Sequence, residues 1–213
     1  MNDNFSTEQE TFWAGEFGTQ YISRNDNTKS ISARTALFSK ILSRTKNIST
    51  ILEIGANIGL NLKGISNLLP SCKFSAIEIN ANAAENLSLI PNTKVFNGSA
   101  FDFSASQLGS YDLTFTSGVL IHINPDRLKQ VYELLYNCSK QYILICEYYN
   151  PTPVEVPYRG HIQRLFKRDF AGDMLDTYND LELVDYGFQY HRDANFPYDD
   201  CTWFLLKKSS QVG

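Results

Sequence analysis

The chain has 213 residues, of which 43% are apolar and 20% are charged, a balance that excludes a disordered or fibrous protein. Its 19 basic and 23 acidic residues leave a net charge of −4 without a long basic run, so we expect no nucleic-acid partner. Apolar runs are only a few residues long, whereas a membrane span needs about 20. The polar, acidic start does not resemble a secretory signal. We therefore expect a soluble, cytoplasmic protein with a single domain and no membrane partner.

The four cysteines lie far apart, each in or beside an apolar segment, and none belongs to a C-x-x-C pair: Cys72, Cys138, Cys146 and Cys201. This usage predicts buried, reduced thiols. No His, Cys or carboxylate triad has the spacing of a metal site, so we expect no metal.

Helices and strands are predicted to alternate along the first half of the chain. Ile31, Thr35, Phe38 and Leu42 fall at helical spacing, which predicts a helix over residues 28–46. Further helices are predicted over residues 59–69 and 81–87. Strands are predicted over residues 50–54, 72–79, 93–96 and 111–117.

In the second half, Asn124 and Pro125 predict the start of a helix, because Asn is a good N-cap and Pro suits the first helical position. An apolar stripe continues that helix through Leu128, Val131 and Leu135. A strand over residues 141–147 follows, then a helix over 162–177. Two strands over 181–190 and 202–207 close the chain.

This order predicts an α/β fold. Strands that alternate with helices form βαβ units around a mostly parallel sheet, and right-handed crossovers place helices on both faces. The last two strands have no helix between them, so they form a hairpin and the final strand is antiparallel. Ligands of such open sheets bind at the carboxyl ends of the strands.

The most informative segment lies at the end of the first of these strands. Glu53 is followed by Gly55, Asn57 and Gly59 in a turn that starts a helix, where the backbone approaches a ligand and free N–H groups are available. A dinucleotide fold requires G-x-G-x-x-G, which fits poorly because Leu60 stands at the third glycine. An acidic residue followed by G-x-G-x-G fits better, since Asn tolerates the left-handed backbone of the middle glycine.

Three more strand ends carry matching groups. Glu78, followed by Ile79, ends the next strand, where a carboxylate accepts ribose hydroxyls. Polar and small residues follow the third and fourth strands: Ser99, Ala100, Phe101, Ser117, Gly118 and Val119.

These four motifs, in order across residues 50–147, resemble those of class I S-adenosylmethionine-dependent methyltransferases. The resemblance implies a Rossmann-like, seven-stranded sheet, with S-adenosylmethionine as cofactor and S-adenosylhomocysteine as product. It implies that residues 99–101 contact the adenine and residues 117–119 the methionine moiety. Cofactor contacts are expected from the turn as well, namely from Glu53, Gly55, Asn57 and Gly59, and from Glu78 and Ile79.

Residues 12–25, FWAGEFGTQYISRN, resemble the opening of the methylases associated with pseudaminic acid biosynthesis, and the likeness includes residues 147–151 and 158–161. The resemblance implies an association with nonulosonic-acid pathways rather than one exact substrate. We therefore expect a small polar acceptor, namely a nonulosonic-acid sugar or a sugar-nucleotide precursor. We expect residues 1–47 to form a helical lid over a methyltransferase domain of residues 48–213. Tyr21 and Arg24 are placed to clamp the methionine carboxylate or close the site, whereas Trp13 and Phe17 are expected to pack.

An oxygen or nitrogen acceptor has to lose a proton, and His is the natural base near neutral pH. We expect His161, ahead of His122, to act as base or substrate ligand, with Glu147 as a further candidate. Tyr148, Tyr149, Tyr158 and Arg159 suit a polar, anionic acceptor.

Three alternatives stay open. The acceptor can be an amino group of a peptide, a protein or another metabolite, and an acidic acceptor channel would favour that reading. The chain can also be a cofactor-binding partner domain without turnover. A nicotinamide-dependent dehydrogenase is opposed by Leu60 and by the terminal hairpin. The sequence does not predict an oligomeric state.

Overall fold

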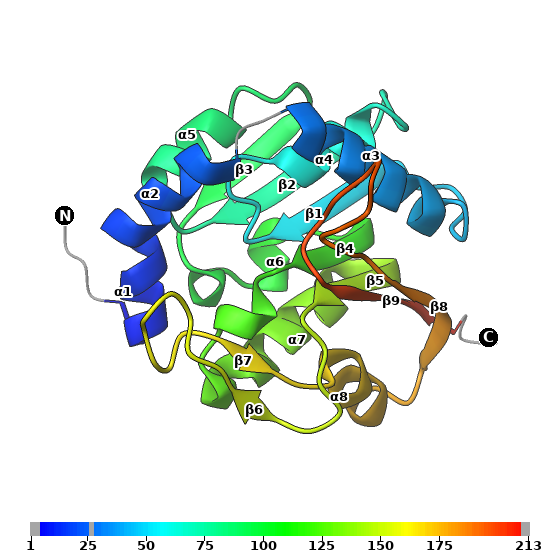
Figure 1. The fold of residues 1–213 in the computed structure, drawn as a ribbon. Coiled ribbons are helices and arrows are strands. Elements are labelled where there is room, and N and C mark those ends of the chain that lie inside the picture. The colour runs from blue at the N-terminus through cyan, green and yellow to red at the C-terminus, as the bar shows by residue number, and fades with distance from the viewer. Residues whose placement is uncertain (1–4, 26–27, 210–213) are drawn as a thin grey trace.

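The computed structural model describes residues 5–25 and 28–209. Its centre is a seven-stranded sheet in the order β3-β2-β1-β4-β5-β9-β8 (Figure 1). The strands are β1 (Thr50–Ile54), β2 (Lys73–Glu78), β3 (Thr93–Asn97), β4 (Tyr111–Ser117), β5 (Ser139–Glu147), β8 (Leu181–Phe188) and β9 (Thr202–Lys208).

Strands β1 to β5 are parallel, and β9 runs antiparallel to both of its neighbours, β5 and β8. This confirms the predicted mostly parallel sheet in which the last strand of the chain is antiparallel. It also brings the carboxyl ends of β1, β2, β3 and β4 to one edge, where all four motifs of the sequence meet.

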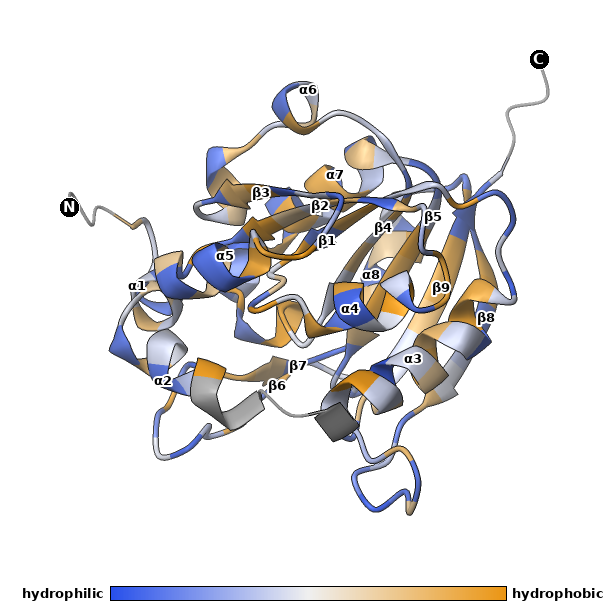
Figure 2. Ribbon diagram, turned by 90° about the horizontal axis from the view of Figure 1, so that it is seen from above, coloured by the Kyte–Doolittle hydropathy of each residue, from blue (hydrophilic) through white to orange (hydrophobic). Residues whose placement is uncertain are grey.

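Helices cover both faces of the sheet (Figure 2). One face packs on α3 (Thr28–Leu42), α4 (Leu60–Ser66) and α5 (Ala81–Leu87), the other on α6 (Ala105–Leu108), α7 (Leu128–Cys138) and α8 (Phe170–Thr177). Successive side chains of a strand point to opposite faces, so Ile51 enters the first core and Leu52 the second. All four cysteines are buried and free.

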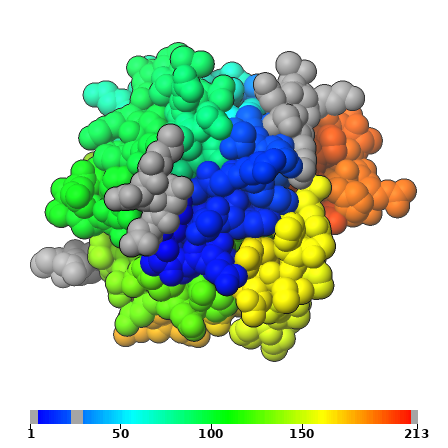
Figure 3. Space-filling model, turned by 90° about the vertical axis from the view of Figure 1, so that its left-hand side faces the viewer, coloured from blue at the N-terminus to red at the C-terminus, as the bar shows by residue number. Residues whose placement is uncertain are grey.

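Two short helices at the N-terminus, α1 (Glu8–Ala14) and α2 (Glu16–Asn25), lie across the carboxyl-end edge of the sheet. Figure 3 shows them next to the segment of residues 150–168. The side chain of Asn80 ties them to the sheet, because its amide Nδ2 lies 3.1–3.3 Å from the carbonyl oxygens of Trp13, Ala14 and Gly15 and the hydroxyl of Thr19.

The predicted helix over residues 162–177 is wrong in its first half. Residues Phe166–Lys167 form strand β7, which pairs with β6 (Val154–Glu155), and α8 begins only at Phe170. Asp169 caps α8 by accepting the N–H of Gly172, and Ile162, expected on the buried face of the helix, is 69% exposed. Backbone pairing with residues 154–156 therefore overrides the helical spacing of this stretch.

Candidate functional site

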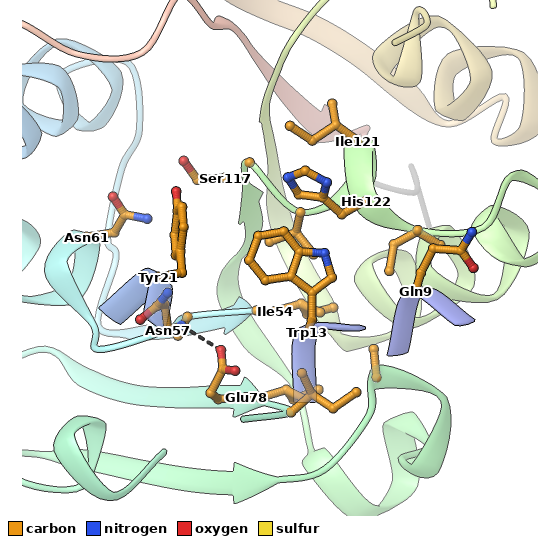
Figure 4. Close-up of a pocket in the computed structure, with 18 of the residues that line it drawn as sticks. Gln9, Trp13, Tyr21, Ile54, Asn57, Asn61, Glu78, Ser117, Ile121 and His122 are labelled. Atoms are coloured by element: carbon orange, nitrogen blue, oxygen red, sulfur yellow. Dashed lines mark hydrogen bonds between the residues drawn. The ribbon is translucent and has the colours of Figure 1, made fainter. Parts of the chain in front are cut away.

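A cavity runs along the carboxyl ends of β1, β2 and β4, under α1 and α2. It holds about 1410 Å³ with its open mouth included, enough for a nucleoside-sized ligand and a second small molecule. In Figure 4 the side chain of Trp13 projects from α1 into the middle of the cavity. His122 lies on one side of it, and Tyr21 and Glu78 lie on the other.

The turn between β1 and α4 forms the floor. Gly55, Asn57 and Gly59 have φ angles of 74°, 49° and 72°, the left-handed region that the sequence pattern predicted for such a turn. A Cβ on Gly55 would lie 2.5 Å from Cγ2 of Val119, so a larger residue does not fit. Gly55 and Asn57 face the cavity, whereas Gly59 packs against Leu87.

Glu78 lies at the end of β2 and lines the cavity. Its Oε2 accepts the N–H of Asn57 at 2.6 Å, and its Oε1 accepts the N–H of Asn80 at 2.8 Å. Burial raises its pKa, although these backbone hydrogen bonds oppose the shift. The two bonds fix the carboxylate in one orientation and leave each oxygen a second lone pair for a ligand hydroxyl.

The wall next to β3 consists of Ile79, Ser99, Ala100 and Phe101, all of which line the cavity. Ser99 begins a short 3-10 turn and its hydroxyl accepts the N–H of Phe101 at 3.3 Å. This end of the cavity is therefore largely apolar.

The opposite wall follows β4. Ser117, Gly118 and Val119 line the cavity, and no atom lies within 4 Å of a Cβ built on Gly118, so a ligand can approach its backbone. The hydroxyl of Tyr198 lies 3.1 Å from that of Ser117 and 3.5 Å from the Asn61 amide oxygen. Neither Tyr198 nor Asn61 was predicted from the sequence.

Glu53 lies behind the cavity wall. Its Oε1 accepts the amide N–H of Asn61 at 2.7 Å, whereas its Oε2 is buried without a partner. Burial raises its pKa to about 8, opposed by the hydrogen bond from Asn61 and by the charge of Arg34. Glu53 does not line the cavity itself, but its hydrogen bond orients Asn61, which does.

Two side chains of the N-terminal region also line this end, Tyr21 from α2 and Arg34 from α3. The guanidinium of Arg34 lies over the ring of Tyr198 at 5.0 Å, and its Nε is buried without a partner. Arg34 therefore places a cation in the cavity wall. The side chain of Arg24, the cation expected here, lies outside the described part of α2.

His122 lines the cavity, stacked between Trp13 and Tyr158 at ring-centroid distances of 4.5 and 4.9 Å. Its Nδ1 lies 2.5 Å from the carbonyl oxygen of Arg164. A carbonyl only accepts, so Nδ1 carries the hydrogen and Nε2 keeps its lone pair. Burial lowers the pKa of His122 to about 4, against the effect of the Arg164 carbonyl. The ring is neutral at pH 7.

The other two candidate bases lie elsewhere. His161 is exposed, its ring lies 5.0 Å from that of Phe12 in α1, and it does not line the cavity. Glu147 is buried under the turn after β4, where its Oε1 accepts the N–H groups of Val119 and Leu120. Burial raises the pKa of Glu147 to about 7, and those two bonds oppose the shift.

The residues predicted to bind the acceptor divide into two pairs. Tyr148 and Tyr158 line the cavity. Tyr149 is 42% exposed and packs on Phe204, and Arg159 is exposed, neither being part of the wall.

The cavity also contains residues for which the sequence carried no motif: Thr7, Gln9, Glu10, Trp13, Arg34, Asn61, Ile121, Ile123, Asn124, Tyr198 and Asp199. Trp13 was expected only to pack. The capping box formed by Thr7 and Glu10 is a sequence signal that could have predicted α1, because it marks the start of a helix. It does not predict that this helix lies over the sheet edge.

The same fold is found in solved methyltransferases. The plantazolicin methyltransferase BpumL in complex with S-adenosylhomocysteine has a TM-score of 0.65 at 17% sequence identity, over 95% of this chain and 94% of BpumL. Human N-acetylserotonin methyltransferase in complex with S-adenosylmethionine has a TM-score of 0.67 at 18% identity, over 97% of this chain and 60% of its own. The mitomycin 7-O-methyltransferase MmcR has a TM-score of 0.66 at 11% sequence identity, over 95% of this chain and 61% of MmcR. No family model and no curated protein matches the sequence.

The fold is therefore that of class I S-adenosylmethionine-dependent methyltransferases. At these identities the likeness establishes the architecture, and the activity is argued from the residues of the site. Over residues 5–25 and 28–209, no helix has the length and apolarity to cross a membrane, and no group of three His, Cys, Asp or Glu side chains is placed to hold a metal ion.

Proposed function

We propose that this protein is an S-adenosylmethionine-dependent methyltransferase that acts on an oxygen or nitrogen of a small polar acceptor. The observation that carries the proposal is Glu78, a buried carboxylate at the end of β2 that is held by two backbone N–H groups and faces the cavity. The two hydroxyl groups of a ribose are donors spaced to match the two oxygens of a carboxylate, so a ribose is the ligand that Glu78 fits.

The chemistry of the remaining wall fits the rest of this cofactor. The apolar wall at Ile79, Ala100 and Phe101 suits a purine. At the other end, the guanidinium of Arg34 suits an amino-acid carboxylate. Tyr21 lines the same end and is a second candidate contact for that carboxylate. Gly55 and Gly118 let the ligand approach the backbone.

When bound, S-adenosylmethionine supplies an electrophilic methyl group on a sulfonium. The protein has to hold the acceptor in line with that group and accept its proton. We assign the proton to Nε2 of His122, because Nδ1 is engaged with the Arg164 carbonyl and the buried ring is neutral at pH 7. Glu147 then acts as a positioning residue that holds the Val119–Ile121 backbone next to His122.

The acceptor is a further part of the proposal. The resemblance of residues 12–25 supports a nonulosonic-acid sugar or sugar nucleotide, held between Tyr148 and Tyr158. An amino group of a peptide, protein or other metabolite is the second candidate. Among the described residues that line the cavity, Asp199 is the carboxylate that the cofactor assignment leaves unused, and it favours this cationic acceptor.

We propose that residues 1–47 act as a lid on the domain of residues 48–213. The contacts of Asn80 with α1 and α2, together with the position of Trp13 inside the cavity, support this division. The buried free thiols support a reducing, cytoplasmic compartment.

Calorimetric titration of the protein with S-adenosylmethionine, S-adenosylhomocysteine and NAD tests the cofactor. Micromolar affinity for the first two and none for NAD is expected. Methyl transfer from labelled S-adenosylmethionine is then measured with nonulosonic acids, their nucleotide-activated forms and a panel of peptides and small amines. Cofactor affinity without transfer to any of these would favour a cofactor-binding partner domain, and binding of NAD alone would overturn the proposal.

A further inference from the structure

Among residues 5–25 and 28–209, the end of the cavity next to β3 has one charged side chain that does not come from the sheet. Glu10 belongs to α1, yet it is only 7% exposed and lines the cavity together with Ser99 and Ala100. A buried carboxylate is rarely found without hydrogen-bond donors from the protein or from a ligand. We therefore compare the donors that the protein gives Glu10 with the capacity of the carboxylate to accept one from a ligand.

The carboxylate is held in place from the protein side. Its Oε2 accepts the hydroxyl of Ser6 at 2.7 Å, and the N–H and hydroxyl of Thr7 at 2.9 Å each. These bonds complete the capping box of α1, and all of them end on the same oxygen. Oε1 is thus the oxygen with capacity for a further donor.

Ser99, which follows β3, lines the cavity at the same end as Glu10. Burial alone would raise the pKa of Glu10, but the hydroxyl groups of Ser99, Ser6 and Thr7 outweigh it and lower the pKa below its ordinary value. Glu10 is ionised at neutral pH and acts as an acceptor only.

The acid that follows β3 in the sequence is engaged elsewhere. Asp102 accepts the N–H of Ser99 at 2.8 Å as part of the local 3-10 turn and does not line the cavity. Near the apolar wall of Ala100 and Phe101, Glu10 is therefore the carboxylate that a base can reach.

We infer that Glu10 accepts a hydrogen bond from the exocyclic amino group of the adenine and so determines the base specificity of the cofactor site. This inference rests on the proposed function, because it needs a nucleoside whose ribose meets Glu78. A 6-amino group donates to a carboxylate, whereas a 6-oxo group presents a second acceptor and is repelled. Helix α1 is then part of the cofactor site, and the same helix places Trp13 at the acceptor side.

The test compares two ligands by calorimetry, S-adenosylhomocysteine and its deaminated 6-oxo analogue, S-inosylhomocysteine. The wild-type protein is expected to prefer the adenine form by about 10- to 100-fold, the range of a hydrogen bond to a charged group. In Glu10→Gln the preference is expected to fall at least about tenfold, because a neutral amide both accepts and donates. Gln is accepted at this position of a capping box, so α1 is retained.

The matched control is Glu8→Gln, which removes the same charge from the exposed side of the same helix, where Glu8 pairs with Arg164. It is expected to keep the wild-type preference. Equal affinity of the wild-type protein for both ligands, or an unchanged preference in Glu10→Gln, would overturn the inference while the proposed function stands. Failure of the wild-type protein to bind either ligand would overturn both.

Discussion

The backbone N–H of Val119 donates to Oε1 of Glu147 at 3.1 Å, which joins the ends of β4 and β5. The N–H of Leu120 shares that oxygen at 3.2 Å, and the N–H of Ile121 lies 3.5 Å from Oε2. One buried carboxylate therefore shapes the turn that presents Val119 to the cavity and leads into His122.

We predict that Glu147→Ala destabilises the protein by about 1–3 kcal/mol, because it leaves buried N–H groups without an acceptor. Chemical denaturation measures the free energy of unfolding, with the exposed Glu133→Ala on α7 as control. An unchanged free energy of unfolding in Glu147→Ala would contradict the role of this carboxylate in the turn.

We predict that Glu78→Gln weakens S-adenosylhomocysteine binding by about 10- to 100-fold, because the ribose loses a charged acceptor. The amide also keeps only one oxygen for the two N–H groups of Asn57 and Asn80. Calorimetry measures the affinity, and a melting curve checks that the fold persists. The exposed Glu85→Gln on α5 should bind as the wild-type protein does. Wild-type affinity in Glu78→Gln would remove the ribose assignment.

We predict that His122→Ala reduces methyl transfer by about 100-fold or more, the contribution of a general base, while S-adenosylhomocysteine affinity stays within a few-fold. His161→Ala, outside the cavity, should retain activity. Because the pKa of His122 is lowered to about 4 and the neutral ring is the active form, the rate should rise through pH 4 and show no further histidine step between pH 6 and 8. Full activity of His122→Ala would exclude this base.

We predict that Glu53 makes the protein less stable as the pH rises. Its pKa in the folded protein is raised from 4.5 to about 8, so between these values the folded state holds a proton that the unfolded state has lost. The contribution of the protonated Glu53 to the free energy of unfolding is fully present below about pH 4.5 and is lost as the pH rises to about 8. Glu53→Gln should remove up to about 1.4 kcal/mol per pH unit of this slope.

The measurement for Glu53 is the free energy of unfolding in denaturant at several pH values. The exposed Glu182→Gln on β8 serves as the control and should leave the slope as it is in the wild-type protein. An identical pH dependence in Glu53→Gln and the wild-type protein would show that Glu53 titrates normally.

We predict that Gly55→Ala impairs both folding and cofactor binding. A Cβ at a φ of 74° costs roughly 1–2 kcal/mol, and it would overlap Cγ2 of Val119. The double variant Gly55→Ala, Val119→Ala removes the overlap and should recover part of the melting temperature, but not the part due to the backbone. No recovery at all would mean that the overlap with Val119 is unimportant.

The motifs at the strand ends could be predicted because their chemistry is local. A buried strand, a turn with left-handed residues and a carboxylate at the end of the next strand all follow from neighbouring residues and from the rule that parallel strands end at one edge. The positions of Gly55, Asn57 and Glu78 on the cavity agree with that reasoning. The first half of the helix predicted over residues 162–177 is wrong because helical spacing in a short segment competes with long-range backbone pairing, whereas α8 confirms the second half.

By itself, therefore, the sequence determined the mostly parallel sheet and the order of the motifs at its strand ends, which line one end of the cavity. Only the tertiary structure decided which side chains from distant segments enter that cavity. It places Glu10, Trp13 and Arg34 on the cavity wall and His161 outside it, and it sets the tautomer of His122 through the carbonyl of Arg164. The reason is that these contacts depend on how α1 to α3 and the segment of residues 150–168 pack on the sheet edge. No spacing within a single segment encodes that packing.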